Sequence, residues 1–127
     1  MDPNLNNGQS PTRGSGWIGV DLDGVLAYYD RFRGHNHIGK PVPAMVKRVQ
    51  AWLHKGYEVR IFTARAALRS QAINNLIEAW CEEHIGRRLT VTCIKDPKCI
   101  AIYDDKAFRV IQNTGKVVTN QAMKRDN

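Results

Sequence analysis

The chain has 127 residues, of which 43% are hydrophobic, and its formal charge is +7 from 19 basic and 12 acidic side chains. This length fits one domain with a sizeable core, and the apolar fraction excludes a disordered chain. No apolar run reaches the about 18 residues of a membrane span. The N-terminus lacks a signal-peptide pattern, so we expect a cytoplasmic protein without a membrane partner. The basic balance favours a phosphate-rich partner such as a nucleotide or nucleic acid, and a basic surface that only aids solubility is the alternative.

Cysteine usage limits the function further. The three cysteines, Cys81, Cys93 and Cys99, are odd in number and lack CxxC spacing, which argues against a disulfide framework and a zinc site. We expect buried free thiols.

The N-terminal part of the chain holds a tail and a first strand. Residues 1–16 contain two prolines, three glycines and three asparagines, so we expect a flexible tail. Residues 17–20 (WIGV) are short, apolar and β-prone, as is typical of a buried parallel strand. Asp21 and Asp23 follow, and they point to the same side if the extended geometry persists, while Gly24 allows a sharp turn. Two acids at a strand's carboxyl end predict a site for a divalent cation and a phosphate.

A long segment and a helix come next. Residues 27–42 form a loop of a length that usually serves a function, and its end contains prolines that resist helix and strand. Residues 43–56 have helical apolar spacing, with Pro43 suited to the first turn and Gly56 to the end. The predicted loop is rich in aromatic and basic side chains: Tyr28, Tyr29, Arg31, Phe32, Arg33, His35, His37 and Lys40.

Strands and helices then alternate to the C-terminal end. Residues 57–62 predict a second strand, 70–84 a second helix, 89–94 a third strand and 99–103 a fourth. We expect a β-hairpin over 107–119 with its turn at Asn113-Thr114-Gly115, and fraying over 121–127. The alternation predicts a Rossmann-like three-layer α/β sandwich, with a mainly parallel sheet and helices on both faces.

The ends of the four predicted strands carry polar side chains that can perform chemistry. Because ligands gather beyond the carboxyl ends of parallel strands, we expect these side chains to meet at one edge of the sheet. They are Asp21 and Asp23, Thr63, Lys95, and Asp104 and Asp105.

These residues resemble the motifs of a known family. DLDGV at 21–25 resembles the first motif, DxDGT/V, of the haloacid dehalogenase superfamily. Thr63 in IFTAR matches the hydroxyl residue of its second motif, Lys95 the lysine of its third, and Asp104-Asp105 the acids of its fourth. The resemblance covers residues 17–112 and implies a Mg²⁺-dependent phosphohydrolase with an aspartate nucleophile on a single catalytic domain over 17–120.

The resemblance implies a role for each acid. Asp21 attacks phosphorus, forms an aspartyl-phosphate and gives Mg²⁺ one oxygen. Asp23 protonates the leaving oxygen and later deprotonates water, and its backbone carbonyl is a further metal ligand. Asp104 is the second side-chain ligand, and Asp105 acts through a water or holds Lys95.

The remaining motif residues contact the phosphoryl group. Thr63 donates a hydrogen bond to it and Lys95 offsets its negative charge, with Lys98 as the alternative lysine. Each motif residue taken alone has an ordinary structural explanation: Thr63 could cap a turn, and Lys95 could be a solvated surface residue. Four motifs at four strand ends favour the functional interpretation.

Basic residues around these motifs are candidates for substrate contact. His35 and His37 form an HxH pair without a third soft ligand, so a substrate contact or plain surface is expected rather than a metal site. Arg65 is a candidate phosphate contact, and Arg69 follows it. The predicted substrate-binding residues are Arg33, His37, Lys40 and Arg65.

The chain leaves no room for the cap domain that many family members carry. Specificity would then come from the 27–42 loop, from another subunit or from a large substrate, and both a monomer and a small homo-oligomer remain open. The fourth motif and basic surface also resemble the 3′-phosphatase domain of phage polynucleotide kinase, while small capless phage and bacterial relatives look closer. The alternatives are therefore a nucleotide or nucleic-acid-end phosphatase, and a non-catalytic basic nucleic-acid-binding module on the same fold.

Overall fold

The structure is a computed structural model that describes residues 16–119. The predicted tail over residues 1–16, apart from Gly16, and the predicted frayed end over 121–127 lie outside the described residues.

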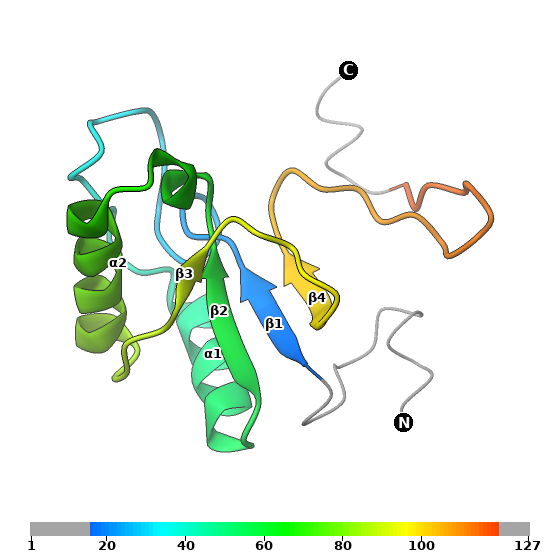
Figure 1. Ribbon diagram of the computed structural model, residues 1–127, viewed down its shortest axis with the longest axis horizontal. Helices are drawn as coiled ribbons and strands as arrows, with labels where there is room; N and C mark the ends of the chain where they lie inside the picture. The colour runs from blue at the N-terminus through cyan, green and yellow to red at the C-terminus, as the bar shows by residue number, and fades with distance from the viewer. Residues whose placement is uncertain (1–15, 120–127) are drawn as a thin grey trace.

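The centre of the protein is a four-stranded parallel sheet in the order β3-β2-β1-β4 (Figure 1). Its strands are β1 (Trp17–Val20), β2 (Glu58–Phe62), β3 (Val91–Thr92) and β4 (Cys99–Tyr103). The four predicted strands and the parallel sheet are thereby confirmed. The third strand is shorter than expected, since only two of residues 89–94 pair with β2.

Two α-helices and one 3₁₀ helix connect the strands. They are α1 (Pro43–His54), η2 (Ala64–Leu68) and α2 (Gln71–His84). Pro43 begins α1, as predicted, because a first-turn residue needs no backbone N–H donor. The Ser70 hydroxyl accepts from Ile73 N–H and caps α2 at its N-terminus. Both predicted helices are confirmed.

Both α-helices cover the same face of the sheet, so the prediction of three layers is wrong for the described residues. Buried residues of α1 (Val46, Val49) and α2 (Ile73, Ile77) join one core cluster with Ile18 of β1. The steps from β1 to β2 and from β2 to β3 run in the same direction, and right-handed crossovers then place both helices on one side. A helix between β3 and β4 would have covered the other face, but residues 93–98 connect these strands without one.

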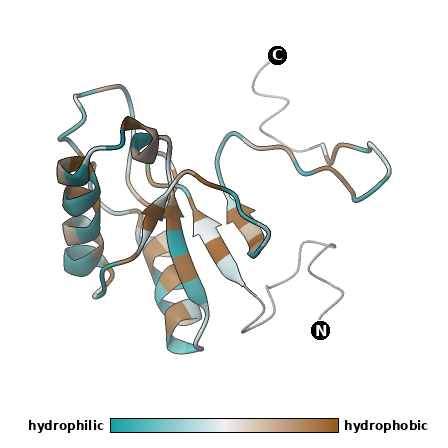
Figure 2. Cartoon of the chain, viewed as in Figure 1, coloured by the Kyte–Doolittle hydropathy of each residue, from teal (hydrophilic) through white to brown (hydrophobic). Residues whose placement is uncertain are grey.

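The opposite face is covered around Trp17, which is fully buried but lies outside the core cluster. The Trp17 indole N–H donates to the Asp96 carboxylate at 2.9 Å, and the Trp17 ring contacts Phe62 and the Arg60 guanidinium. The 93–98 connection is therefore anchored to the start of β1. Figure 2 shows apolar residues along the strands, and hydrophilic ones alternating with them on both helices.

The predicted C-terminal hairpin is present in a minimal form. One antiparallel bridge joins Val110 to Val117, and the turn between them places Asn113 and Gly115 at φ of 65° and 73°. No longer strand pairing forms, because residues 105–119 are all exposed and bury no apolar face. The hairpin therefore extends away from the sheet beyond β4 (Figure 1).

The cysteines are free, as predicted, but only Cys81 is buried; Cys93 is exposed and Cys99 is partly exposed. Among residues 16–119, neither α-helix has the length and apolar character needed to cross a membrane.

Candidate active site

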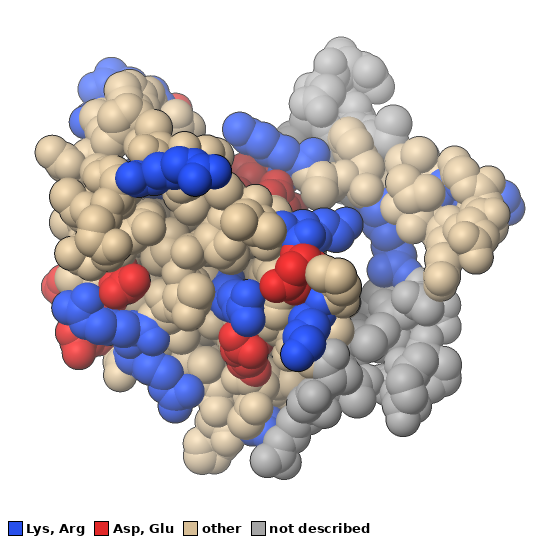
Figure 3. Space-filling view, in the orientation of Figure 1, with Lys and Arg blue, Asp and Glu red and all other residues tan. Residues whose placement is uncertain are grey.

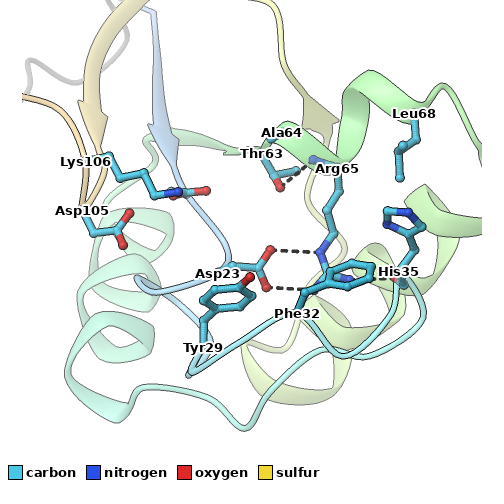
Figure 4. A pocket seen from close by; sticks show the side chains of 11 residues that line it. Asp23, Tyr29, Phe32, His35, Thr63, Ala64, Arg65, Leu68, Asp105 and Lys106 are labelled. Atoms are coloured by element: carbon cyan, nitrogen blue, oxygen red, sulfur yellow. Dashed lines mark hydrogen bonds and ion pairs between the residues drawn. The ribbon is translucent and has the colours of Figure 1, made fainter.

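A cleft of about 280 Å³ lies at the carboxyl edge of the sheet (Figure 4). Side chains from the ends of β1, β2 and β4, from the long loop and from η2 line it. The predicted meeting of strand ends at this edge is therefore found for three of the four strands. The lining residues are Asp21, Asp23, Tyr29, Phe32, His35, Thr63, Ala64, Arg65, Leu68, Asp105 and Lys106.

A tight turn after β1 positions the two motif aspartates. The Asp21 N–H donates to the Tyr103 carbonyl at 2.9 Å, which keeps Asp21 level with the end of β4. The Leu22 carbonyl then accepts from three following N–H groups, so the extended geometry ends before Asp23. Gly24 has a φ of +88°, and a Cβ there would lie 2.5 Å from Asp105 Oδ2. A side chain at position 24 would therefore displace the Asp105 carboxylate.

Three carboxylates gather at the β4 side of the cleft. Asp21, Asp104 and Asp105 each offer an oxygen, and these oxygens lie within 4.8 Å of one another. Burial, followed by the charge of Asp104, raises the pKa of Asp21 from 3.8 to about 7; the Leu22 N–H opposes this shift, and Asp105 adds to it. The carboxylates of Asp104 and Asp105 therefore oppose the ionisation of Asp21, in addition to its burial.

Asp23 has the opposite environment. Its two oxygens accept hydrogen bonds from the Arg65 guanidinium at 2.9 and 2.8 Å, and both side chains are largely buried. Arg65 also donates to the backbone carbonyls of His35 at 2.8 Å and His37 at 2.7 Å. Figure 4 shows Asp23 turned toward Arg65. Arg65, predicted as a substrate contact, therefore holds Asp23, η2 and the long loop together.

Thr63 lies in the cleft, as the motif predicts, and also has a structural role. It is only 3% exposed, and its Oγ1 accepts from the Arg65 N–H at the start of η2. The turn-capping alternative is therefore correct for the oxygen, while the hydroxyl hydrogen can still be donated to a ligand.

The structure does not bring Lys95 into the cleft. Lys95 lines a separate cavity of about 360 Å³ beside β4, together with Arg109. The Trp17–Asp96 hydrogen bond explains this placement, because it draws the chain after β3 over the sheet and away from the carboxyl edge. The Lys98 carbonyl accepts from the Trp17 N–H at the start of β1, so Lys98 lies at the other end of the strand. Lys106 is the lysine that lines the cleft.

The other predicted substrate contacts lie beside the cleft rather than in it. Arg33 pairs with Asp30 at 2.6 Å, which lowers the pKa of Asp30 to about 2, and the Lys40 ammonium lies 5.2 Å from the Tyr28 ring centroid. Arg33 and His37 line a hollow of about 20 Å³ that adjoins Asp23 and Arg65.

Sequence reasoning did not select Tyr29, Phe32 or Lys106, which line the cleft, and it left His35 open between a substrate contact and plain surface. Tyr29, Phe32 and His35 come from the long loop, and the Phe32 and His35 rings meet edge-on with centroids 5.2 Å apart. Two signals were available: the aromatic content of residues 27–42, and the position of Lys106 directly after the acidic pair.

Comparison of the chain with models of known protein families, with curated proteins and with solved structures finds no match.

Proposed function

We propose that the protein is a Mg²⁺-dependent phosphomonoester hydrolase that acts through an aspartyl-phosphate on Asp21. The observation that carries this proposal is the group of three carboxylates, Asp21, Asp104 and Asp105, of which Asp21 and Asp105 line the cleft. The resemblance of four ordered motifs to the haloacid dehalogenase superfamily supports it, and so does the parallel sheet. On this proposal the fold is a capless core of that superfamily over residues 17–120.

The donor chemistry of the site fits Mg²⁺. Carboxylate oxygens are hard ligands, and Mg²⁺ in proteins needs only one or two of them because it keeps several waters. Asp21, Asp104 and Asp105 would hold the ion. Burial, followed by the charge of Asp104, raises the pKa of Asp21, and a cation would offset that charge. The Asp23 carboxylate is paired with Arg65, so the candidate ligand from this residue is its backbone carbonyl, which the resemblance implies. When bound, the ion neutralises phosphoryl oxygens so that a carboxylate can approach phosphorus.

The reaction has two steps on this chain's own residues. An Asp21 oxygen attacks phosphorus and the bond from phosphorus to the leaving oxygen breaks, while Asp23 gives that oxygen a proton. Asp23 then takes a proton from water, which attacks the aspartyl-phosphate, releases inorganic phosphate and regenerates Asp21. Since both Asp23 oxygens accept from Arg65, Arg65 has to give up at least one hydrogen bond during proton transfer.

Two further side chains complete the proposed site. The Thr63 hydroxyl donates to the phosphoryl group, and the Lys106 ammonium offsets its charge from the β4 side. Figure 4 shows Lys106 reaching over the cleft from the side of Asp105. Lys106 thus takes the role that the resemblance gives to Lys95.

The test is hydrolysis of a panel of phosphomonoesters, beginning with p-nitrophenyl phosphate, with and without Mg²⁺. We expect turnover that needs Mg²⁺ and falls about 1,000-fold or more in Asp21→Asn. Glu83→Gln is the control, because it makes the same change of carboxylate to amide on an exposed helix position. A wild type that hydrolyses nothing in a panel of nucleotides, sugar phosphates and phosphorylated oligonucleotides would rule the proposal out.

The same experiment separates the alternatives. Preference for 3′-phosphorylated oligonucleotides would favour a nucleic-acid-end phosphatase. A salt-dependent gel shift with single strands and no hydrolysis would favour the non-catalytic binding module.

A further inference from the structure

The cleft has two ends of different chemistry. One end is built from Asp21, Asp105, Thr63 and Lys106, which are the proposed phosphoryl-transfer groups. The other end is built from the rings of Tyr29, Phe32 and His35, with Leu68 of η2 beside them. Because both ends line one continuous cavity, a molecule whose phosphate lies at the first end places its leaving group against the rings.

The rings at this end are not part of the core. Tyr29 is 50% exposed and Phe32 is 64% exposed, and neither belongs to the core cluster or packs against it. Burial in the fold therefore does not explain their position, and their faces remain accessible to a ligand. Single exposed apolar residues are normal, but two exposed rings that line the same catalytic cleft form a surface suited to stacking.

The ring wall is held in place. Arg65 binds the carbonyls of His35 and His37 while its other contacts fix it to Asp23. The backbone that carries His35, whose ring contacts Phe32, is thereby tied to the catalytic end. A wall that is ordered before the ligand arrives binds at a smaller entropic cost.

The charge of the cleft limits the size of the anion. Arg65 and Lys106 are its only cationic lining residues in the described chain, and Arg65 is already paired with Asp23. The Lys106 ammonium therefore remains to bind a single phosphoryl group. On the face shown in Figure 3, basic groups are interrupted by acidic and uncharged ones and form no continuous track for a phosphate backbone.

We infer that the substrate is a phosphomonoester whose leaving group carries a flat ring, of the nucleoside monophosphate class, with the ring stacked on Phe32 and Tyr29. This inference rests on the proposed function. Stacking is tolerant of base identity because every base has a π face, so purine and pyrimidine nucleotides should both be accepted.

The test compares ribose 5-phosphate with nucleoside 5′-monophosphates, which share the leaving alcohol and differ by the base. We expect kcat/KM to be about tenfold higher for the nucleotides. Phe32→Leu should lower kcat/KM for the nucleotides and so remove most of their advantage over ribose 5-phosphate. Phe108→Leu is the matched control, because Phe108 is also exposed but lies outside the cleft. Equal kcat/KM for the two substrate types in the wild type would overturn the inference and leave the phosphatase proposal standing.

A binding measurement covers the case in which no hydrolysis is found. Calorimetry on Asp21→Asn with Mg²⁺ should give tighter binding of nucleoside monophosphate than of ribose 5-phosphate, and Phe32→Leu added to that variant should remove the difference. Ring-dependent binding in a protein without phosphatase activity would overturn the proposed function and support the ring site. No ring dependence in either measurement would overturn the ring site itself.

Discussion

Asp21 and Asp23 stand two residues apart but lie in opposite electrostatic surroundings. Asp21 faces Asp104 and Asp105, and its pKa rises to about 7 because burial and like charges oppose its ionisation. Asp23 faces Arg65, which meets both of its oxygens within 2.9 Å. Asp21 thus has acidic neighbours, whereas the negative charge of Asp23 is paired with the positive charge of Arg65.

On the proposed function, this difference would give the two aspartates of one short motif different roles. A carboxylate in a cluster with excess negative charge is suited to hold a cation and to approach a neutralised phosphoryl group. On the proposed function, the tie between Asp23 and an arginine that also binds the loop at His35 and His37 would link proton transfer to the position of that loop. Each prediction below changes one side of this comparison.

The largest expected effect is the loss of turnover in Asp21→Asn and Asp23→Asn, each by about 1,000-fold or more. The two variants should fail at different steps. p-Nitrophenolate leaves without a proton, so Asp23→Asn should still form the aspartyl-phosphate and then accumulate it because water is not activated. Mass spectrometry of acid-quenched protein should show one added phosphoryl group in Asp23→Asn and none in Asp21→Asn. An unmodified Asp23→Asn protein would contradict the division of roles.

The second prediction concerns which lysine serves the carboxylate cluster. Lys106→Met should lower kcat/KM by about 100-fold, since it removes the cation that faces the developing charge. Lys95→Met is the matched control and should leave kcat/KM unchanged, because Lys95 lines another cavity. Steady-state kinetics on both variants checks this. The reverse result would show that the connection after β3 moves Lys95 into the site during the reaction.

The lysines also show which features of the site could be predicted from the sequence and which could not. The strands, the helices and the carboxylates at the strand ends follow from periodicity and local chemistry, and the structure agrees with them. The position of Lys95 could not be predicted in this way. It depends on the hydrogen bond between Trp17 and Asp96, which are 79 residues apart and meet only in the folded chain. A motif can therefore mark a strand end correctly and still misplace a side chain beyond it.

Two other differences have the same origin. The contact of Arg65 with the His35 and His37 carbonyls joins η2 to a loop about 30 residues earlier, and no local pattern encodes a side chain-to-backbone contact. The missing third layer reflects the length of the 93–98 connection, which is too short for a helix; strand alternation alone did not reveal it.

A third prediction tests the Asp23 side of the comparison. Arg65→Lys keeps the charge but cannot form the forked pair with Asp23 and reach two carbonyls as well. We expect kcat/KM to fall about tenfold, because the loop and Asp23 lose their fixed positions. Trypsin should also cleave faster after Arg31 and Arg33, which lie in that loop. Arg48→Lys, on the exposed side of α1, is the control, and equal cleavage rates in both variants would show that Arg65 does not hold the loop.

The smallest expected effect is on the stability of the metal-free protein, and it isolates the Asp21 side. The folded pKa of Asp21, about 7, lies above its ordinary value of 3.8, so the folded state keeps a proton that the unfolded state loses between these pH values. Stability should therefore fall as pH rises through this window and level off above it. The full shift would correspond to about 4 kcal/mol, and because Asp21 is partly open to solvent we expect screening to reduce it to about 1–2 kcal/mol.

Urea unfolding of Asp21→Asn should show it more stable than wild type by this amount at pH 8 and equal to it near pH 3.5. Added Mg²⁺ should stabilise the wild type at pH 8 and not the variant, whereas an equal difference between the two proteins at both pH values would mean that Asp21 is not held in excess negative charge.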